Sequence, residues 1–266
     1  MHFRFLALIA LTAMLSAACH AQATAAKHPD LSGTWSFTID LPPSQLTKEV
    51  NGVATVVKVD RGVVVPRNTA WKGALPFTKQ PSYKPEFQEK VKYLAENESK
   101  TDPVFYCDRP GIPRIGPPRR IIQLPNEMVF LYEDISGDPY RIIPVLDQKA
   151  AATAHRKDAN PSYYGDSVGH WEGKTLVIDA RNFVEETWVG EEGAFHSDAL
   201  RVIERLWKDG EYLVYQATVE DPKVLTEPWT IAPRVVKPST ERLEESPKCV
   251  ESDGDKLMNK DHHLQR

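Results

Sequence analysis

Short stretches of alternating apolar and polar residues, separated by tight turns, run through the second half of this 266-residue chain. Such stretches are typical of half-buried β-strands, and their close spacing favours an antiparallel meander. The expected strands cover residues 120–124, 128–134, 140–147, 167–171, 175–180, 200–207 and 212–220, with a short edge strand between 229 and 236. A meander of about eight strands tends to close, because closure removes its exposed edges. We therefore expect a mainly β fold, an antiparallel meander closed into a barrel.

Proline punctuates the first half of the chain. The sequence holds 21 prolines and 14 glycines, and the excess lies in residues 41–118 and in turns between the expected strands. Strand interiors are nearly free of proline, which cannot donate a hydrogen bond to a sheet. We therefore expect one domain over residues 24–250, in which residues 30–118 wrap a meander formed by residues 119–238. The polar residues 251–266 are expected to form a flexible tail.

Three regular elements are expected within the wrapping. The alternation around Trp35 predicts a first strand. Residues 53–59 and 62–65 are expected to pair as a hairpin. Residues 85–98 are expected to form the one clear helix, because Pro85 suits a first turn and an apolar stripe follows at helical spacing, made by Phe87, Val91 and Leu94.

The first 23 residues have the layout of a secretory signal peptide. Met1–Arg4 is a short basic start, an apolar stretch follows, and Ala21-Gln22-Ala23 fits a cleavage site. Export to the periplasm or out of the cell is therefore expected, with lipidation at Cys19 as the alternative. No later apolar stretch is long enough to span a bilayer.

Cleavage of that peptide would leave two cysteines, Cys107 and Cys249. Two cysteines in an oxidising compartment usually pair, so a disulfide is expected, with two separate buried thiols as the alternative. Neither has a CxxC partner, and no two internal histidines have helical i, i+4 spacing, so no metal site is expected. The sequence also lacks the glycine-rich nucleotide loop and the calcium loop. We therefore expect no cofactor.

Several segments taken together resemble one large protein family. They are Asp30–Trp35, Tyr83–Phe87, Asp102–Cys107, Pro113-Arg114, Gly165–Gly173, His196-Ser197, Glu204-Arg205, Asp221-Pro222 and Pro228–Thr230. From about residue 30 to 250, this series resembles a family of secreted bacterial proteins, most of them uncharacterised. The resemblance implies export and a lipocalin-like (calycin) β-barrel core, and it implies little about chemistry. Members of that family usually carry a basic residue where His170 stands here.

Strand alternation assigns side chains to the two faces of the expected barrel. Glu204 interrupts an otherwise apolar row over residues 200–206, while Arg141 and Tyr132 head similar rows. A charge on an apolar face must be paired, protonated or functional. One interpretation is an acid–base pair at a pocket, and the other is a buried pair between Glu204 and an arginine that fixes the barrel.

Further candidate site residues lie in turns. His196 precedes the strand that carries Glu204, where a histidine can act as general base or acid, or can fix its loop by a hydrogen bond. Tyr164 can supply a proton at a neighbouring loop. Substrate contacts are expected from Arg120, Asp166, Trp171 and Trp188. Core packing explains the tryptophans equally well, and a solvated face explains the arginine.

The segment Gly165–Gly169 matches the G-x-S-x-G motif around the nucleophile of α/β-hydrolases. In those enzymes the serine lies between a strand and a helix, whereas the residues after Gly169 predict a strand and a turn. Asp179 and His196 follow Ser167 in the order of a catalytic triad. A serine hydrolase using Ser167 is therefore kept as a third candidate function.

The leading functional expectation is an exported, cofactor-independent lyase that acts on a small, apolar, aromatic molecule in a barrel pocket. Elimination, dehydration or ether cleavage needs a base, an acid for the leaving oxygen and a dry pocket. In this scheme His196 is the base, Tyr132 or Tyr164 is the acid, and Glu204 and Arg141 orient the site. A non-catalytic periplasmic carrier of an apolar ligand is the alternative. The formal charge of -4 gives no reason to expect nucleic acid as a partner, and the oligomeric state stays open.

Overall fold

The computed structural model describes residues 28–37, 45–50, 53–58, 80–134 and 136–247, together with Cys249. The chain divides after Asp30 into two compact units, and every strand belongs to the second unit. The expected signal peptide, Cys19 and the expected tail lie outside the described residues. No helix among the described residues is long and apolar enough to cross a lipid bilayer.

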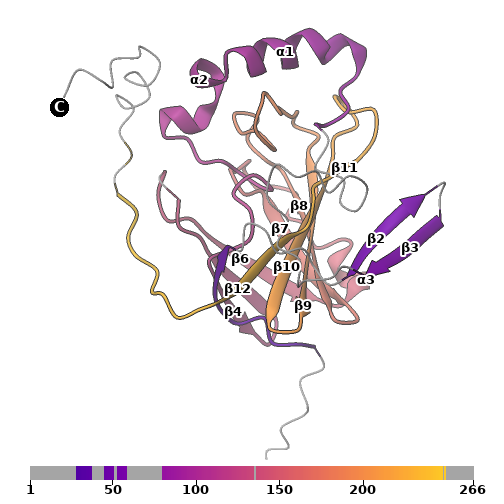
Figure 1. The fold of residues 1–266 in the computed structure, drawn as a ribbon, viewed down its shortest axis with the longest axis vertical. Coiled ribbons are helices and arrows are strands. Elements are labelled where there is room, and N and C mark those ends of the chain that lie inside the picture. Colours follow the sequence, from indigo (N-terminus) through magenta and orange to yellow (C-terminus); the bar gives the residue numbers. More distant parts are fainter. Residues whose placement is uncertain are drawn as a thin grey trace, which may run out of the picture. The chain divides into compact units, whose positions relative to one another are not determined.

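Nine strands of the second unit close into a β-barrel (Figure 1). Around the barrel they follow the order β10, β12, β1, β4, β5, β6, β7, β8 and β9, and β9 pairs with β10 again. Their bounds are β1 Gly33–Phe37, β4 Arg120–Leu124, β5 Glu127–Leu131, β6 Tyr140–Leu146, β7 Asp166–Glu172, β8 Thr175–Arg181, β9 Arg201–Asp209, β10 Tyr212–Glu220 and β12 Arg234–Ser239. The short β11, Trp229–Thr230, adds to the end of β10 beyond the part that pairs with β12. The expected mainly β barrel is thus confirmed, and it is consistent with a lipocalin-like barrel.

The pairing differs from an antiparallel meander at one place, because β6 and β7 are parallel. Their connection carries the short helix α3, Gln148–Ala151, and returns the chain to the end at which β6 began. Parallel neighbours require such a crossover. The β6–β7 ladder joins only Val145 to Gly169 and Leu146 to His170, whereas β9 and β10 pair through nine residues each. The first halves of β6 and β7 therefore do not pair with each other.

The barrel interior is filled by the inward rows of its strands. Val202, Glu204 and Leu206 are buried on β9, and Leu213, Tyr215 and Ala217 are buried on β10. On β9 the buried residues alternate with less buried ones, as the two-residue period of a β-strand requires. The interior is therefore a packed core with charged and hydroxyl groups at selected places.

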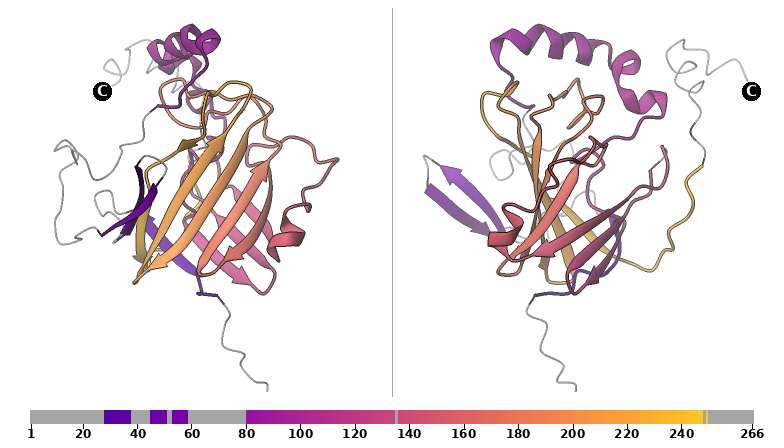
Figure 2. Two further views of the ribbon diagram at one scale, coloured as in Figure 1. Left: turned by 90° about the vertical axis from the view of Figure 1, so that its right-hand side faces the viewer. Right: turned by 180° about the vertical axis from the view of Figure 1, so that it is seen from behind.

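The expected helix over residues 85–98 is present in three pieces. Pro85–Phe87 forms a 3-10 turn, α1 covers Gln88–Glu96, and α2 covers Glu98–Thr101. The expected stripe packs against the core, and Gly193 makes this close approach possible, since a Cβ there would lie 2.8 Å from the Cβ of Leu94. In Figure 2 this helix lies across one end of the barrel. A second 3-10 turn, Pro103–Tyr106, follows it.

One hairpin in the wrapping was not among the expected elements. β2, Gln45–Val50, pairs with β3, Val53–Lys58, so the partner of β3 precedes it in the chain. The two residues between these strands are Asn51-Gly52, which is the strongest two-residue hairpin signal in a sequence. The expected pairing of residues 53–59 with residues 62–65 stays a prediction. Residues 62–65 lie outside the described residues.

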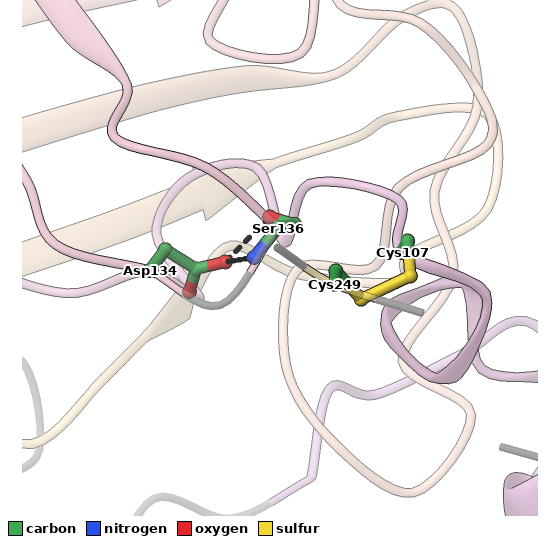
Figure 3. The surroundings of a disulfide bond; sticks show 4 residues. All are labelled: Cys107, Asp134, Ser136 and Cys249. Carbon is green, nitrogen blue, oxygen red and sulfur yellow. Dashed lines mark hydrogen bonds between the residues drawn. A yellow bond between two sulfur atoms is a disulfide. The ribbon is translucent and has the colours of Figure 1, made fainter. Parts of the chain in front are cut away.

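The expected disulfide is present. Cys107 and Cys249 are bonded, with their Cα atoms 5.7 Å apart. The C-terminal segment is also tied to the loop between β5 and β6, because the backbone N–H of Ser246 donates to the carboxylate of Asp138 at 3.0 Å. Figure 3 shows the turn at Asp134 and Ser136 of this loop in the surroundings of the disulfide. The disulfide and this hydrogen bond together therefore hold three segments that are distant in the sequence.

Candidate functional site

A buried hydrogen-bonded cluster occupies one part of the barrel interior. Arg141 on β6 binds both carboxylate oxygens of Glu204 on β9, at 3.0 and 2.6 Å. The same guanidinium donates to Tyr132 Oη at 3.1 Å and to Ser167 Oγ at 2.8 Å. Tyr215 on β10 donates its hydroxyl proton to Glu204 at 3.0 Å. We call these five residues the Arg141 cluster.

Burial and charge shift the pKa values of three groups in the Arg141 cluster, the two tyrosines and the arginine. Burial raises the pKa of Tyr132 to about 12, where Arg141 works against the shift and Glu204 adds to it. Burial, supported by Glu204, raises the pKa of Tyr215 well above its usual value. Burial opposes the charge of Arg141, but Glu204 and Tyr132 outweigh it and raise the pKa of the guanidinium. At neutral pH both tyrosines therefore keep their protons and Arg141 keeps its charge.

The pairing of Arg141 with Glu204 answers a question that the sequence left open. Glu204 is fully buried, and Arg141 is 5% exposed. Both oxygens of Glu204 are held by Arg141, and one also accepts from Tyr215. The structural interpretation of Glu204, a buried pair with an arginine, is thus the arrangement present. Bidentate pairs of this kind are among the strong, charge-assisted hydrogen bonds of proteins.

A cavity of about 810 Å³ opens where β6 and β7 diverge, and we call it the β6–β7 cavity. Its walls carry several polar side chains, among them Arg109, Arg141, Arg156, Tyr164, Asp166 and Ser167. The opening follows from the short parallel ladder, since no backbone pairing joins the first halves of the two strands. Two residues of the Arg141 cluster, Arg141 and Ser167, therefore form part of the wall of this cavity.

Two polar atoms beside the β6–β7 cavity lack hydrogen-bond partners among the described residues. They are Nε of Arg141 and the hydroxyl of Tyr164, both fully buried. The ring of Tyr164 stacks on that of Tyr132, with centroids 6.2 Å apart. Burial, supported by the nearby Asp134, raises the pKa of Tyr164, so its hydroxyl keeps its proton. Buried polar groups are nearly always hydrogen-bonded, and each exception calls for an explanation such as water or a ligand.

Gly165 sets the path of the chain between Tyr164 and β7. Its φ is +66°, and a Cβ at this position would lie 2.6 Å from the carbonyl oxygen of Arg181. Only glycine fits both the backbone conformation and the space. The first glycine of the G-x-S-x-G match is thus required by the strand entry.

Asp166 lines the cavity but is already occupied. It accepts from Nε of Arg156 at 2.7 Å, from the backbone N–H of the same residue at 3.0 Å, and contacts Nδ1 of His155 at 3.1 Å. Burial favours the protonated carboxyl, but these hydrogen bonds outweigh it and lower the pKa of Asp166. The expected substrate contact of Asp166 is therefore a loop anchor at the wall of the cavity.

His196 lies elsewhere, in a separate cavity of about 500 Å³ between helix α1 and the loop that carries Trp188. We call this the His196 cavity. Nδ1 of His196 lies 2.9 Å from the carbonyl oxygen of Ser197, so this nitrogen carries the proton, and Nε2 accepts from the hydroxyl of Thr187 at 2.8 Å. Burial lowers the pKa of His196. Both ring nitrogens are engaged, which matches the loop-fixing alternative.

The structure therefore does not bring the expected acid and base together. Tyr164 and Arg141 line the β6–β7 cavity, whereas His196 lines a different one. Tyr132, the other expected acid, lines a third cavity of about 350 Å³ beside Trp35. The scheme in which His196 serves Tyr132 or Tyr164 needs correction, because strand alternation assigns faces but does not place a buried loop.

Two of the remaining predicted contacts, Arg120 and Trp171, line neither of these two cavities, whereas Trp188 lines one of them. Arg120 is exposed on β4, and Trp171 is half-buried on β7, where it packs against the core. Trp188 lines the His196 cavity as an aromatic wall. The core-packing alternative for Trp171 and the solvated face for Arg120 are therefore the arrangements present.

Ser167 is not arranged as a hydrolase nucleophile. It lies inside β7, and its hydroxyl oxygen accepts from Arg141. The two ring nitrogens of His196 bind Thr187 and Ser197 instead. A guanidinium cannot take the serine proton, because arginine keeps its own proton at any physiological pH. The third candidate function is therefore disfavoured.

Sequence reasoning missed two residues, Tyr215 of the Arg141 cluster and Arg109 at the β6–β7 cavity. Tyr215 belongs to an apolar row on β10, and its lone hydroxyl in that row was the available signal. Arg109 lies in the irregular Pro-rich segment, which has no periodicity to assign a face. It lines the cavity and lies over the ring of Tyr163, with 5.8 Å between the guanidinium carbon and the ring centroid.

Among the described residues, no group of three or more His, Cys, Asp or Glu side chains is arranged to hold a metal ion. No protein-family profile matches the chain, and searches of the curated proteins and of the solved structures find no match.

Proposed function

We propose that this protein is an exported binding protein that carries a small ligand in the β6–β7 cavity. The observation that carries the proposal is the β6–β7 cavity, because two of the residues that line it, Tyr164 and Arg141, each have a buried polar atom without a partner among the described residues. An unpaired buried polar group costs about 1–3 kcal/mol. A ligand that bonds to the tyrosine hydroxyl would remove part of that cost, which favours binding.

Export rests on two independent supports. The first 23 residues have the composition of a signal peptide. The disulfide between Cys107 and Cys249 is typical of proteins that leave the reducing cytosol. The resemblance to secreted bacterial proteins is in line with both.

The cavity favours a ligand that is less apolar than the sequence suggested. Arg141 and Arg156 each bind a carboxylate of this chain, whereas Arg109 forms no hydrogen bond or ion pair with any described residue. A free guanidinium suits a carboxylate or another anionic group of the ligand. The protonated hydroxyl of Tyr164 suits an acceptor. We therefore expect a ligand that combines an anionic end with an acceptor group.

Native mass spectrometry of protein purified without denaturant tests the proposal. We expect a co-purified ligand in the wild type and its loss from Tyr164→Phe, which removes only the hydroxyl at the cavity. Tyr83→Phe is the matched control, because the hydroxyl of Tyr83 bonds to the carbonyl of Phe195 outside this cavity. Equal ligand occupancy in Tyr164→Phe and the wild type, or ligand loss from the control alone, would contradict the proposal.

Lyase chemistry is the second candidate, and one observation favours it. The protonated hydroxyl of Tyr164 and the charged Arg141 lie at one cavity, as an acid and an anion-stabilising group must. Incubating the released ligand with the protein and following its mass tests this candidate. Turnover that Tyr164→Phe abolishes and His196→Ala retains would support catalysis with Tyr164 as the acid. Recovery of the ligand unchanged would exclude lyase activity on it and leave the binding function as the supported candidate.

A further inference from the structure

The first half of β6 exposes a free strand edge to the β6–β7 cavity. On the β5 side, the N–H of Tyr132 donates to the carbonyl oxygen of Pro139 at 3.0 Å. The N–H of Val145 donates to the carbonyl oxygen of Asn126 at 2.8 Å. In an antiparallel pair such bonds recur at every second residue. Arg141 and Ile143, which lie at every second position between Pro139 and Val145, therefore direct their backbone N–H and C=O groups to β5.

The intervening residues, Tyr140 and Ile142, direct their N–H and C=O groups away from β5. On that side β7 begins to pair only at Val145, opposite Gly169. Tyr140 and Ile142 both line the β6–β7 cavity, and neither bonds through its backbone to another described residue there. Two donors and two acceptors thus face the cavity in a fixed order.

We propose that the ligand of the β6–β7 cavity is an extended peptide that adds to this edge of β6. This inference rests on the proposed binding function and names its ligand class. An extended chain presents an N–H and a C=O at every second residue, about 6.6–6.8 Å apart, which is the repeat of the groups at Tyr140 and Ile142. Strand addition of this kind obtains its affinity from main-chain hydrogen bonds.

The surroundings of the edge limit how a peptide can dock. Pro144 has no N–H, so the donors available on this edge end at Ile142. Tyr140 and Ile142 expose 65% and 56% of their surface and offer apolar contacts beside the edge. Arg109, which lines the same cavity, provides a charge for the carboxyl group of a peptide. We therefore expect a short extended segment with a free carboxylate.

Calorimetric titration tests this inference, with N-acetyl-Thr-Val-Thr-Val-Thr bearing a free carboxyl group as the probe. Two analogues carry N-methyl groups, one on both valines and one on the first and third threonines. In an extended chain these two sets of N–H groups lie on opposite edges. We expect at least one analogue to bind about tenfold more weakly than the parent, as the loss of a backbone hydrogen bond predicts. Equal binding of all three peptides, or no binding of the parent, would overturn the inference.

A pair of protein variants repeats the test from the other side. Ile142→Pro removes the N–H that faces the cavity and leaves the bonds to β5 in place, whereas Ile142→Val retains that N–H. We expect the proline variant to bind the parent peptide about tenfold more weakly and the valine variant to bind it normally. Equal affinities would overturn the inference. If Ile142→Pro does not fold, the methylated peptides decide alone.

The two proposals fail in different ways. If the peptide does not bind, but a non-peptide ligand co-purifies and is lost from Tyr164→Phe, the peptide inference is overturned and the binding function stands. If neither binds, both proposals fall.

Discussion

The β6–β7 cavity and the His196 cavity both place buried polar side chains beside open space, but they differ in how those side chains are bonded. His196 has a partner on each ring nitrogen, and no buried side-chain atom described at its cavity lacks one. At the β6–β7 cavity the hydroxyl of Tyr164 and Nε of Arg141 have none among the described residues. The difference teaches that burial and a cavity are not sufficient signs of a binding site. Unfulfilled hydrogen bonding is the more selective sign.

The largest effect is expected when the buried ion pair between Arg141 and Glu204 is broken. Glu204→Ala leaves Arg141 buried and unpaired, so we expect the free energy of unfolding to fall by about 3–5 kcal/mol. Urea denaturation measures this loss. The double variant Arg141→Met with Glu204→Leu should recover most of it, because two apolar side chains replace the pair. A loss below about 1 kcal/mol from Glu204→Ala would show that this charge is not buried as described.

The disulfide supports both regions, and its removal should loosen both. Cys107 precedes Asp108, which lines the His196 cavity, and Arg109, which lines the β6–β7 cavity. Replacing both cysteines by serine should lower the free energy of unfolding by about 2–5 kcal/mol. Denaturation of the wild type with and without reductant is the matched comparison. An unchanged midpoint in reductant would argue against a stabilising bond.

Two tyrosine variants sharpen the distinction between bonded and unbonded hydroxyls. Tyr215→Phe removes a hydrogen bond to the charged Glu204, so we expect a loss of about 1.5–3 kcal/mol. Tyr164→Phe removes a hydroxyl without a described partner, so stability should stay the same or rise slightly. Chemical denaturation of both ligand-stripped variants gives the comparison. Equal losses would mean that Tyr164 is bonded in the free protein.

The smallest effect is expected when the pH is lowered, and it is the loss of stability that His196 causes. Burial lowers the pKa of His196 in the folded state below its usual 6.5. Above about 6.5 the ring is neutral in both states, whereas below it the unfolded chain takes up a proton that the folded chain resists. Stability should therefore fall as the pH drops through 6.5 toward the lowered pKa. Unfolding curves at several pH values should show a weaker decline in His196→Gln, and parallel declines would count against the neutral histidine.

The barrel and the charged pair were predictable from local pattern. Glu204 stands in an apolar row, and period-two alternation alone places it inside a barrel. The disulfide followed from the count of cysteines after export. The position of Tyr164 at a cavity was also expected, and its role there stays a prediction.

The positions of the cavities could not be predicted, because they depend on pairing between strands that are distant in the sequence. Strand alternation gives faces, not neighbours, and the parallel pairing of β6 with β7 opens the cavity. His196 was misplaced because the loop from Thr187 to His196 folds inward without any periodic signal. Arg109 lies in a Pro-rich segment with the same lack of pattern.

Amide hydrogen exchange at Ile142 tests the ligand site most directly, in ligand-stripped protein and in protein that carries its co-purified ligand. We predict fast exchange at Ile142 in the stripped protein, slow exchange at Ile143 and Arg141 because they bond to β5, and protection of Ile142 by the ligand. Unchanged exchange at Ile142, with protection appearing instead around His196, would contradict a ligand site between β6 and β7.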